Sequence, residues 1–548
     1  MQIQRFKNSF AENIFKHKYA QGVDDTWDAL AERLVEDVCG TRWGKDRALM
    51  SQSDRDQLVQ YIKEMKFVPG GRYLWYAGRK NSYFNNCFLL RAEEDTREEW
   101  ASLTQRAVSC LMTGGGIGTD YSILRPSGKP LSRTGGLSSG PLPLMQMINE
   151  AGRGVMQGGS RRSAIYASLN WLHEDITNFL TAKNWSTLIR DQKNLDFNFP
   201  APLDMTNISV NYDDKWLYNA DRANLHIFVE NCRQAMMTGE PGFSFNFGDK
   251  QNETLRNACT EVTSEDDSDV CNLGSINISN ITSLEEFKNV VELGSKCLVC
   301  GTLRADLPYD KVYKVREKNR RLGLGLMGIH AWLLQRGYGY EVTPELHEWL
   351  KVYRDESERA SNEHCERLYI SKPIAYRAIA PTGSIGILAG TTTGIEPLFA
   401  VAYKRRYLTD GTKWKYEYVV DTTADQLIKE YGLDPSKIET AQSLSTDFEK
   451  RISFQASIQD YVDMSISSTI NLPEWGSKYN NENRVLEFAE ILSKYAPRLR
   501  GFTAYPDGSR GGQPLTPVEY AEAMRHKGVV FAENDICEIG GKGGSCGV

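Results

Sequence analysis

The sequence predicts a large globular protein, built either as one large barrel with appended segments or as several domains. Two observations lead to this prediction. The chain has 548 residues, which is more than one ordinary hydrophobic core accommodates. Hydrophobic residues make up 41% of it and charged residues 25%, which is an ordinary balance for a soluble globular protein. Both helical and strand-like patterns follow along the chain.

Charge and cysteine content argue against several classes of protein. The formal net charge is −6, from 65 basic and 71 acidic residues, whereas a general nucleic-acid surface would be basic. No apolar run is long enough to span a membrane, and the first residues lack the apolar core of a secretion signal. Eleven cysteines are too few for a disulfide scaffold in a chain of this length. We therefore expect a cytoplasmic protein that binds neither membrane nor nucleic acid, in which any disulfide is transient and catalytic.

Residues 1–66 are predicted to form a helical N-terminal region. Residues 26–40 place apolar side chains at helical spacing and end at Gly40, which is a plausible stop signal. Residues 54–65 repeat the helical spacing.

The stretch around Cys259 carries the candidate chemistry. Asn257, Cys259 and Glu261 occupy alternate positions, and alternate residues of an extended segment share a face. A hydrogen-bonding amide, a sulfur and a base that face one small molecule make a catalytic constellation. The alternative is a strand with a buried structural cysteine.

Three further stretches have patterns typical of ligand sites. Asn86 and Cys87 precede a short apolar run. Residues 113–118 hold glycines, which let a backbone approach a ligand closely. Residues 381–386 are predicted to form a turn and a helix start, where successive N–H groups bind phosphate. A plain turn is the alternative for both glycine-containing stretches.

Taken in order, from about Pro69 to about Arg510, these motifs resemble the large catalytic subunit of ribonucleotide reductases. The resemblance implies a ten-stranded α/β barrel of two five-stranded halves with a central finger loop, over residues 67–525. It implies a flexible redox-active tail over residues 526–548. The implied reaction converts ribonucleotides to 2′-deoxyribonucleotides through a thiyl radical.

The same resemblance assigns the chemical roles. Cys259 would carry the radical, Glu261 would take the proton of the 3′-hydroxyl, and Asn257 would hold the sugar. Cys87 and Cys271 would supply two electrons and end as a disulfide, for which their Cα atoms must lie within about 7 Å. The tail pair, Cys537 and Cys546, would reduce that disulfide by exchange and be reset by a thioredoxin-type partner.

Further residues are implied as substrate contacts. Arg72 and Tyr73 stand where many relatives have a threonine near the substrate phosphate, and either side chain would be able to replace it. The remaining expected contacts are Asn86, Gly115, Gly116, Pro381, Thr382, Gly383, Ser384 and Ile385.

Residues 140–205 resemble the region that binds a deoxynucleotide effector. A helix is predicted over residues 143–156, a mobile loop over about 183–202, and a barrel strand over 206–210. A solvated basic turn is the alternative for the effector contacts. Those contacts are expected at Gln157, Gly158, Arg161 and Arg162.

The helix over residues 143–156 also bears on assembly. Some cobalamin-dependent relatives are monomers with an inserted segment that covers the effector site. The interval from Cys87 to Cys259 leaves little room for such an insertion, so we expect a homodimer that pairs this helix across a two-fold axis. A minimal monomer without this regulation is the alternative.

The source of the radical is expected to be adenosylcobalamin. The strand expected around Tyr505 lacks the tyrosine pair that receives a radical from a second subunit, and no glycyl-radical motif is present. The main alternative is the same chemistry fed by a separate radical-generating subunit. A nucleotide-binding relative without catalysis is a further alternative.

Two other stretches are interpreted as structural. The C-x-x-C pair of Cys297 and Cys300 sits in a helical pattern and lacks a second ligand pair nearby, so buried packing is predicted and no metal site. Residues 320–334 resemble a helix of the family that lies under the barrel.

Overall fold

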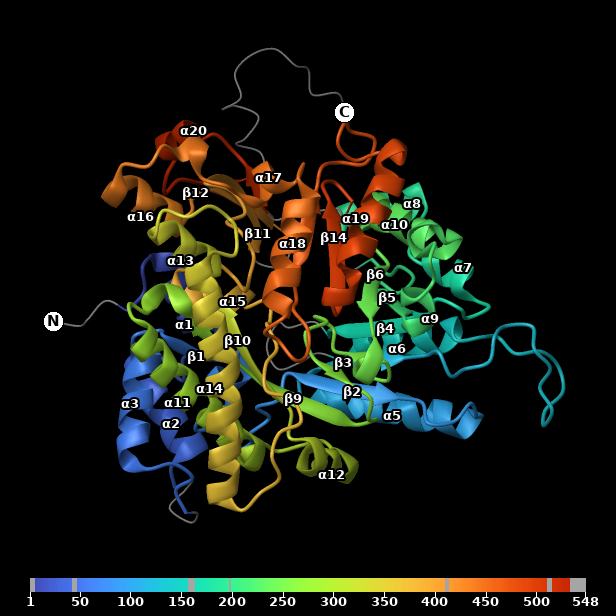
Figure 1. Cartoon of the computed structure of the whole chain (residues 1–548), viewed down its shortest axis with the longest axis horizontal. Helices are drawn as coiled ribbons and strands as arrows, with labels where there is room; N and C mark the ends of the chain where they lie inside the picture. The colour runs from blue at the N-terminus through green and yellow to red at the C-terminus, as the bar shows by residue number, and fades with distance from the viewer. Residues whose placement is uncertain are drawn as a thin grey trace.

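The computed structural model describes residues 5–41, 47–155, 163–196, 199–409, 413–509 and 515–532. Three helices precede the first strand, namely α1 (Ser9–Lys18), α2 (Trp27–Cys39) and α3 (Gln52–Lys63). Each helix is preceded by a capping residue whose side chain accepts a hydrogen bond from a backbone N–H of the first turn. The capping residues are Asn8, Thr26 and Ser51. Helices α2 and α3 pack on each other and on α11 (Leu284–Arg304), on one side of the molecule in Figure 1.

Five strands that pair in parallel, in chain order, form one half of the main sheet. They are β2 (Cys87–Arg91), β3 (Gly116–Asp120), β4 (Ile165–Asn170), β5 (Thr206–Tyr212) and β6 (Gly242–Phe245). The connections contain helices, as parallel pairing requires. The main ones are α5 (Arg97–Met112), α6 (Leu142–Gly154) and α10 (His226–Thr238). The predicted helix over 143–156 and the predicted strand over 206–210 correspond to α6 and β5.

The second half of the sheet also runs in parallel. Its strands are β9 (Asp269–Asn277), β10 (Leu322–Met327), β13 (Thr469–Leu472) and β14 (Gly501–Pro506). Strand β10 pairs with β9, and β13 pairs with β14. Residues 375–380 form the fifth segment of this half. They pair with β10 through the parallel bridge Leu324 to Arg377 and, through the parallel bridge Ile379 to Ile466, with the residues that lead directly into β13.

The two halves meet in antiparallel fashion at β2 with β9 and at β6 with β14. The pairings therefore link ten extended segments into a ring, which agrees with the predicted ten-stranded α/β barrel. Strand β1 (Phe67–Pro69) adds to the far end of β9.

Two predicted elements differ from the structure. Residues 320–334 form strand β10 and the short helix α13 (Ile329–Gln335), not one helix. A Cβ on Gly323 would lie 2.2 Å from the Leu273 side chain, so glycine here lets β10 and β9 pair closely. The loop expected over 183–202 contains helix α8 (Thr187–Leu195), which Ser186 caps through the amide of Ile189.

A smaller antiparallel sheet with helices α16 (Thr422–Tyr431) and α20 (Tyr520–Arg525) lies at the top of Figure 1 and was not predicted. Strand β16 pairs with β12 through Ala532, which lies seven residues into the segment expected as a flexible tail. The strands, in spatial order, are β15 (Leu515–Pro517), β11 (Ala402–Thr409), β12 (Lys413–Val420) and β16 (Val530–Ala532).

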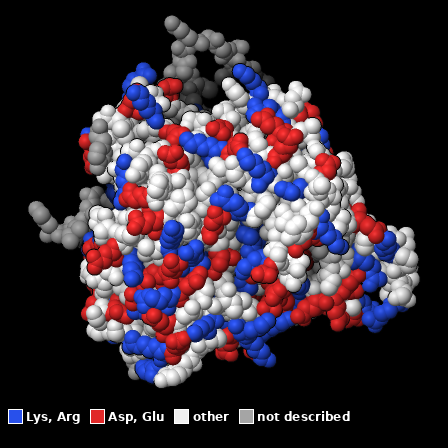
Figure 2. All heavy atoms as spheres, viewed as in Figure 1, with Lys and Arg blue, Asp and Glu red and all other residues white. Residues whose placement is uncertain are grey.

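The cysteines of the C-x-x-C pair are buried within α11, so the predicted packing role is confirmed. On the face shown in Figure 2, basic and acidic side chains are interspersed. Within the described ranges, no helix is both long and apolar enough to span a membrane.

Candidate active site

A short hairpin, β7 (Leu255–Arg256) with β8 (Thr263–Ser264), carries residues 257–262 into the centre of the ring. The Asn207 side chain of β5 donates to the carbonyl oxygen of Ala258 at 3.0 Å. On the opposite half, the amide of Ser465 donates to the carbonyl oxygen of Glu261 at 2.9 Å. A Cβ on Gly118 of β3 would lie 1.6 Å from the Arg256 carbonyl oxygen, so this position requires glycine. Strands of both halves thus contact the hairpin, which is the finger loop of the barrel.

The segment from Asn257 to Glu261 is a turn, so the prediction of an extended segment is wrong. The amide of Thr260 donates to the carbonyl oxygen of Asn257 at 2.9 Å, and Thr260 has a φ of +72°. A left-handed residue reverses the chain locally, which an extended strand does not do. The turn nevertheless brings Asn257, Cys259 and Glu261 to one cavity.

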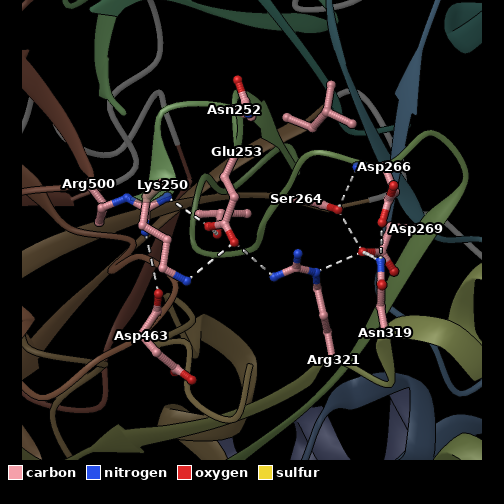
Figure 3. A network of polar contacts seen from close by, with 12 residues as sticks. Lys250, Asn252, Glu253, Ser264, Asp266, Asp269, Asn319, Arg321, Asp463 and Arg500 are labelled. Carbon is pink, nitrogen blue, oxygen red and sulfur yellow. Dashed lines mark hydrogen bonds and ion pairs between the residues drawn. The ribbon is translucent and has the colours of Figure 1, made fainter. Parts of the chain in front are cut away.

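Buried charges hold the base of the finger loop (Figure 3). Arg500 donates to Glu253 at 2.9 Å, and Glu253 accepts from the Thr263 hydroxyl at 2.7 Å. Arg321 donates to Asp269 at 2.7 Å. Although burial opposes it, the charges of Arg500 and Arg321 hold the pKa of Glu253 well below its usual value. Paired buried charges of this kind fix the geometry of the hairpin they flank.

The same network reaches the strand that carries Cys271. Asp269 begins β9 and accepts from the Ser264 hydroxyl of β8 at 2.6 Å. The finger loop and the start of β9 are therefore held in one arrangement.

Cys87 and Cys271 are paired residues of the antiparallel strands β2 and β9. Directly opposed residues in such a pair have Cα atoms about 4.5–5.5 Å apart, which lies within the range that a disulfide spans. Both cysteines are buried and both are free thiols.

Hydrogen bonds connect this thiol pair to the finger loop. The Asn257 amide donates to Cys87 Sγ at 3.0 Å and accepts from the amide of Val262 at 3.0 Å, which fixes its orientation. Cys87 Sγ donates to Glu261 Oε1 at 3.9 Å. The other carboxylate oxygen, Oε2, is buried and has no hydrogen-bond partner among the described residues. One acceptor of Glu261 is thus available to a ligand.

Burial also controls protonation in the site. Burial raises the pKa of Glu261 to about 7. Burial, assisted by the nearby Glu261 charge, raises the pKa of Cys87 well above its ordinary value. Burial and the charge of Asp269 do the same for Cys271. Both thiols therefore keep their protons at neutral pH, whereas Glu261 is poised to gain or lose one.

Cys259 differs from the other described cysteines because it is exposed. It lies on the wall of a cavity of about 240 Å³. The predicted residues that line this cavity are Asn86, Cys87, Gly116, Asn257, Cys259, Glu261, Pro381, Thr382, Gly383, Ser384 and Ile385.

Three expected substrate contacts do not line the cavity. A Cβ on Gly115 would lie 2.4 Å from the Phe88 ring, so this glycine serves packing. Arg72 and Tyr73 belong to the short helix α4 (Gly71–Tyr76) and are buried away from the cavity. Arg72 donates to the carbonyl oxygen of Thr113, and the Tyr73 hydroxyl accepts from the Asn272 amide.

Some predicted residues lie outside the described residues. These are the expected effector contacts Gln157, Gly158, Arg161 and Arg162 and the tail cysteines Cys537 and Cys546.

The cavity also has lining residues that were not among the named candidate contacts, although Gly114 and Ala258 lie within candidate stretches. One of them, Tyr19, directly follows helix α1 and is separated from the next lining residue, Gly70, by a long stretch of sequence. No motif surrounds Tyr19. The others are Gly70, Gly71, Gly114, Ala164, Ala258, Leu273, Ser275 and Ala380. Among the described residues, no group of His, Cys, Asp or Glu side chains is arranged to hold a metal ion.

A ring of two parallel halves around a thiol-bearing finger loop defines the class of protein. The family model described as "Ribonucleotide reductase, barrel domain" matches residues 85–201, 204–354 and 375–494. The chain therefore belongs to the ribonucleotide reductase family and is an enzyme.

Individual relatives share about a quarter of their residues with this chain. A protein named vitamin B12-dependent ribonucleoside-diphosphate reductase from Mycobacterium tuberculosis is 25% identical, over 89% of this chain and 75% of its own. A protein of the same name from Thermoplasma acidophilum is 27% identical, over 84% of this chain and 66% of its own. A solved B12-dependent (class II) ribonucleotide reductase superposes with a TM-score of 0.70 at 16% identity and covers 96% of this chain and 95% of its own. At that identity, the superposition shows a shared fold.

Proposed function

We propose that the protein reduces ribonucleotides to 2′-deoxyribonucleotides by thiyl-radical chemistry, with adenosylcobalamin as the source of the radical. The observation that carries the proposal is the exposed Cys259 in one cavity with Asn257, Glu261 and Cys87. Cys271 does not line this cavity but lies directly opposite Cys87 in the strand pairing. A ribose bound there would face a sulfur, a base and a dithiol.

The reaction proceeds through the protein's own groups. The Cys259 sulfur radical takes the hydrogen atom from C3′, while Glu261 accepts the proton of the 3′-hydroxyl. The 2′-hydroxyl then leaves as water with a proton from the dithiol. Two electrons and the remaining hydrogen come from Cys87 and Cys271, which end joined as a disulfide. Cys259 returns the hydrogen atom to C3′, and Glu261 returns the proton to the 3′-oxygen. The products are one deoxynucleotide, one water molecule and one disulfide per ribonucleotide.

The partners of Glu261 suit its role. A general base works best when its pKa lies near the operating pH, and the pKa of this buried carboxyl is raised to about 7. Asn257, whose orientation is fixed by Val262, presents its amide to the Cys87 thiol and lines the cavity in which the sugar would bind. The protonated thiols keep the hydrogens that the reduction consumes.

The exposure of the Cys259 sulfur is consistent with a radical that comes from bound adenosylcobalamin. Whatever generates the radical must reach the Cys259 sulfur, and Cys259 is an exposed cysteine at the tip of the finger loop. The cofactor would be held over this tip, at Cys259 and Thr260. When bound, it supplies a carbon-centred radical that removes the hydrogen atom of a thiol. Two relatives named as vitamin B12-dependent support the choice.

Repeated turnover requires that the Cys87–Cys271 disulfide be reduced. We assign this to exchange with Cys537 and Cys546, with a thioredoxin-type protein as the external reductant. Strand β16, which pairs with β12 through Ala532, anchors the chain on the N-terminal side of Cys537.

A deoxynucleotide effector is assigned to Gln157, Gly158, Arg161 and Arg162, which directly follow helix α6. On the neighbouring helices α5 and α6, Met112 is 71% exposed and Met147 is 51% exposed. Exposed methionines at this place support a homodimer formed through these helices.

Anaerobic turnover tests the proposal most simply. All four ribonucleotides, as diphosphates and as triphosphates, are incubated with a dithiol, with and without adenosylcobalamin. Product only with the cofactor is expected. Product without the cofactor after addition of a radical-generating subunit would favour the alternative, and no product under either condition would contradict ribonucleotide reduction.

A further inference from the structure

We propose that the N-terminal helix α1 completes the substrate pocket, with Lys18 and Tyr19 binding the phosphate groups of the ribonucleotide. The proposal rests on ribonucleotide reduction as the reaction of this site. It assigns binding residues from a part of the chain that lies outside the matched family model, which begins at residue 85.

Tyr19 is the residue that directly follows α1, and it is buried. Tyr19 lines the cavity together with Gly71 and residues 381–385. A Cβ on Gly71 would lie 3.0 Å from the Tyr19 hydroxyl oxygen, so the absence of a side chain there admits the phenol. A hydroxyl in this position is able to donate to a ligand oxygen.

Lys18 lies at the outer rim of the same end of the cavity. Its ammonium group donates to Ser384 Oγ at 3.3 Å, and Ser384 lines the cavity. The lysine side chain is exposed, so its flexible stem allows the ammonium to follow a phosphate bound beside Ser384. Helix α1 and helix α15 (Gly383–Ala389) pack against each other, which sets this position.

In the part of the chain that the structure describes, the cavity lining has no basic side chain of its own to neutralise a bound phosphate group. Among the described residues that line the cavity, Glu261 is the one charged side chain and none is basic. A nucleoside di- or triphosphate carries several negative charges, and charge-assisted hydrogen bonds from lysine are a common means of binding them. Because Glu261 occupies the end with the reactive thiols, the phosphate groups belong at the end formed by residues 381–385, Tyr19 and Lys18.

Helix α1 is anchored independently of these two residues. Lys7 donates to the carbonyl oxygen of Gly390 at 3.1 Å, and the Asn8 amide donates to the Thr422 hydroxyl at 3.0 Å. Arg5 forms an ion pair with Asp28 at 2.8 Å. Substitution of Lys18 should therefore alter binding without detaching the helix.

The test compares Lys18→Gln, Lys18→Arg and Tyr19→Phe with the matched control Lys16→Gln. Lys16 lies on the same helix, is exposed and pairs with Glu12. Steady-state kinetics gives KM and kcat, and calorimetry without cofactor or reductant gives the Kd of a ribonucleoside diphosphate. Melting temperatures of all variants verify that the fold is kept.

Lys18→Gln is expected to raise KM and Kd about 10-fold with kcat unchanged, because the lost contact is equal in the ground state and the transition state. Lys18→Arg should restore most of the affinity, and Tyr19→Phe should raise Kd about 3-fold. Added salt should weaken binding less in Lys18→Gln than in the unaltered protein.

Equal Kd values for Lys18→Gln and Lys16→Gln, with turnover intact in both, would overturn the proposal and leave ribonucleotide reduction standing. An unaltered protein that binds the nucleotide but never reduces it would contradict the proposed function instead.

Discussion

Cys87 and Cys271 stand directly opposite each other where the two halves of the barrel meet in antiparallel pairing. Opposed strand residues are close enough to form a disulfide without movement of the backbone. The Asn257 amide, 3.0 Å from Cys87 Sγ, joins this pair to the finger loop. The junction of the two halves is therefore the point where a dithiol, an amide and a carboxyl converge.

The first prediction concerns the radical cysteine. Cys259→Ser should lower product formation by at least about 1,000-fold, because an O–H bond is too strong to replace the S–H bond of the thiol. Nucleotide affinity and melting temperature should stay close to those of the unaltered protein, since the side chain is exposed. Cys110→Ser, in helix α5, serves as the control. Turnover by Cys259→Ser at the unaltered rate would refute the assignment.

The second prediction is a pH dependence set by Glu261. Burial raises the pKa of this carboxyl to about 7, and only the ionised form accepts a proton. Accordingly, kcat/KM should rise with pH, about tenfold per unit well below pH 7, and level off above it. Glu261→Gln should remove this dependence together with most of the activity. A flat profile in the unaltered protein between about pH 5 and pH 8 would speak against Glu261 as the base.

The third prediction concerns the tail. Cys546→Ser or Cys537→Ser should still make about one deoxynucleotide per protein, because the Cys87–Cys271 pair starts reduced. Sustained turnover with a thioredoxin-type reductant should stop, whereas a small dithiol should restore part of it. Continued thioredoxin-driven turnover in both variants would exclude the shuttle.

The fourth prediction concerns assembly. Light scattering at micromolar concentration should give a dimer mass, and a bound deoxynucleotide should tighten the dimer, because a ligand that prefers the dimer favours association. Met147→Lys places a charge on the exposed side of α6 and should shift the mass toward the monomer. A monomer mass of the unaltered protein with and without deoxynucleotides would show that the prediction is wrong.

The sequence predicted much of the frame that holds the site. Helix α6 and the buried pair Cys297 and Cys300 were predicted from helical patterns, and strands β5 and β14 from the resemblance to the family. Local pattern failed where long-range contacts decide the structure. Residues 320–334 were expected to form one helix because they resemble a helix of the family, whereas the alternating Leu and Gly residues of β10 have the period of a strand. The adjacent strand β9 explains why Gly323 must be small.

The candidate site shows the same limit. Alternation suggested an extended segment around Cys259, but the left-handed Thr260 makes it a turn. Tyr19 and Ser384 lie far apart in the sequence, and no local signal indicated that they line one cavity. In the smaller sheet, strand β16 pairs with β12, although several helices separate the two strands in the sequence. Local sequence patterns do not indicate such a distant pairing, so these strands were not predicted.

A single-turnover experiment with the fully reduced protein tests the central claim most directly. The protein is mixed anaerobically with a ribonucleotide and adenosylcobalamin, without external reductant, then quenched in acid with a thiol-blocking reagent. Deoxynucleotide is quantified and peptides are mapped by mass spectrometry, with the Cys271→Ala variant as the control. One Cys87–Cys271 disulfide per deoxynucleotide is predicted, or an equivalent tail disulfide after exchange. Deoxynucleotide formed in full while Cys87 and Cys271 both remain free and no tail disulfide appears would contradict the account.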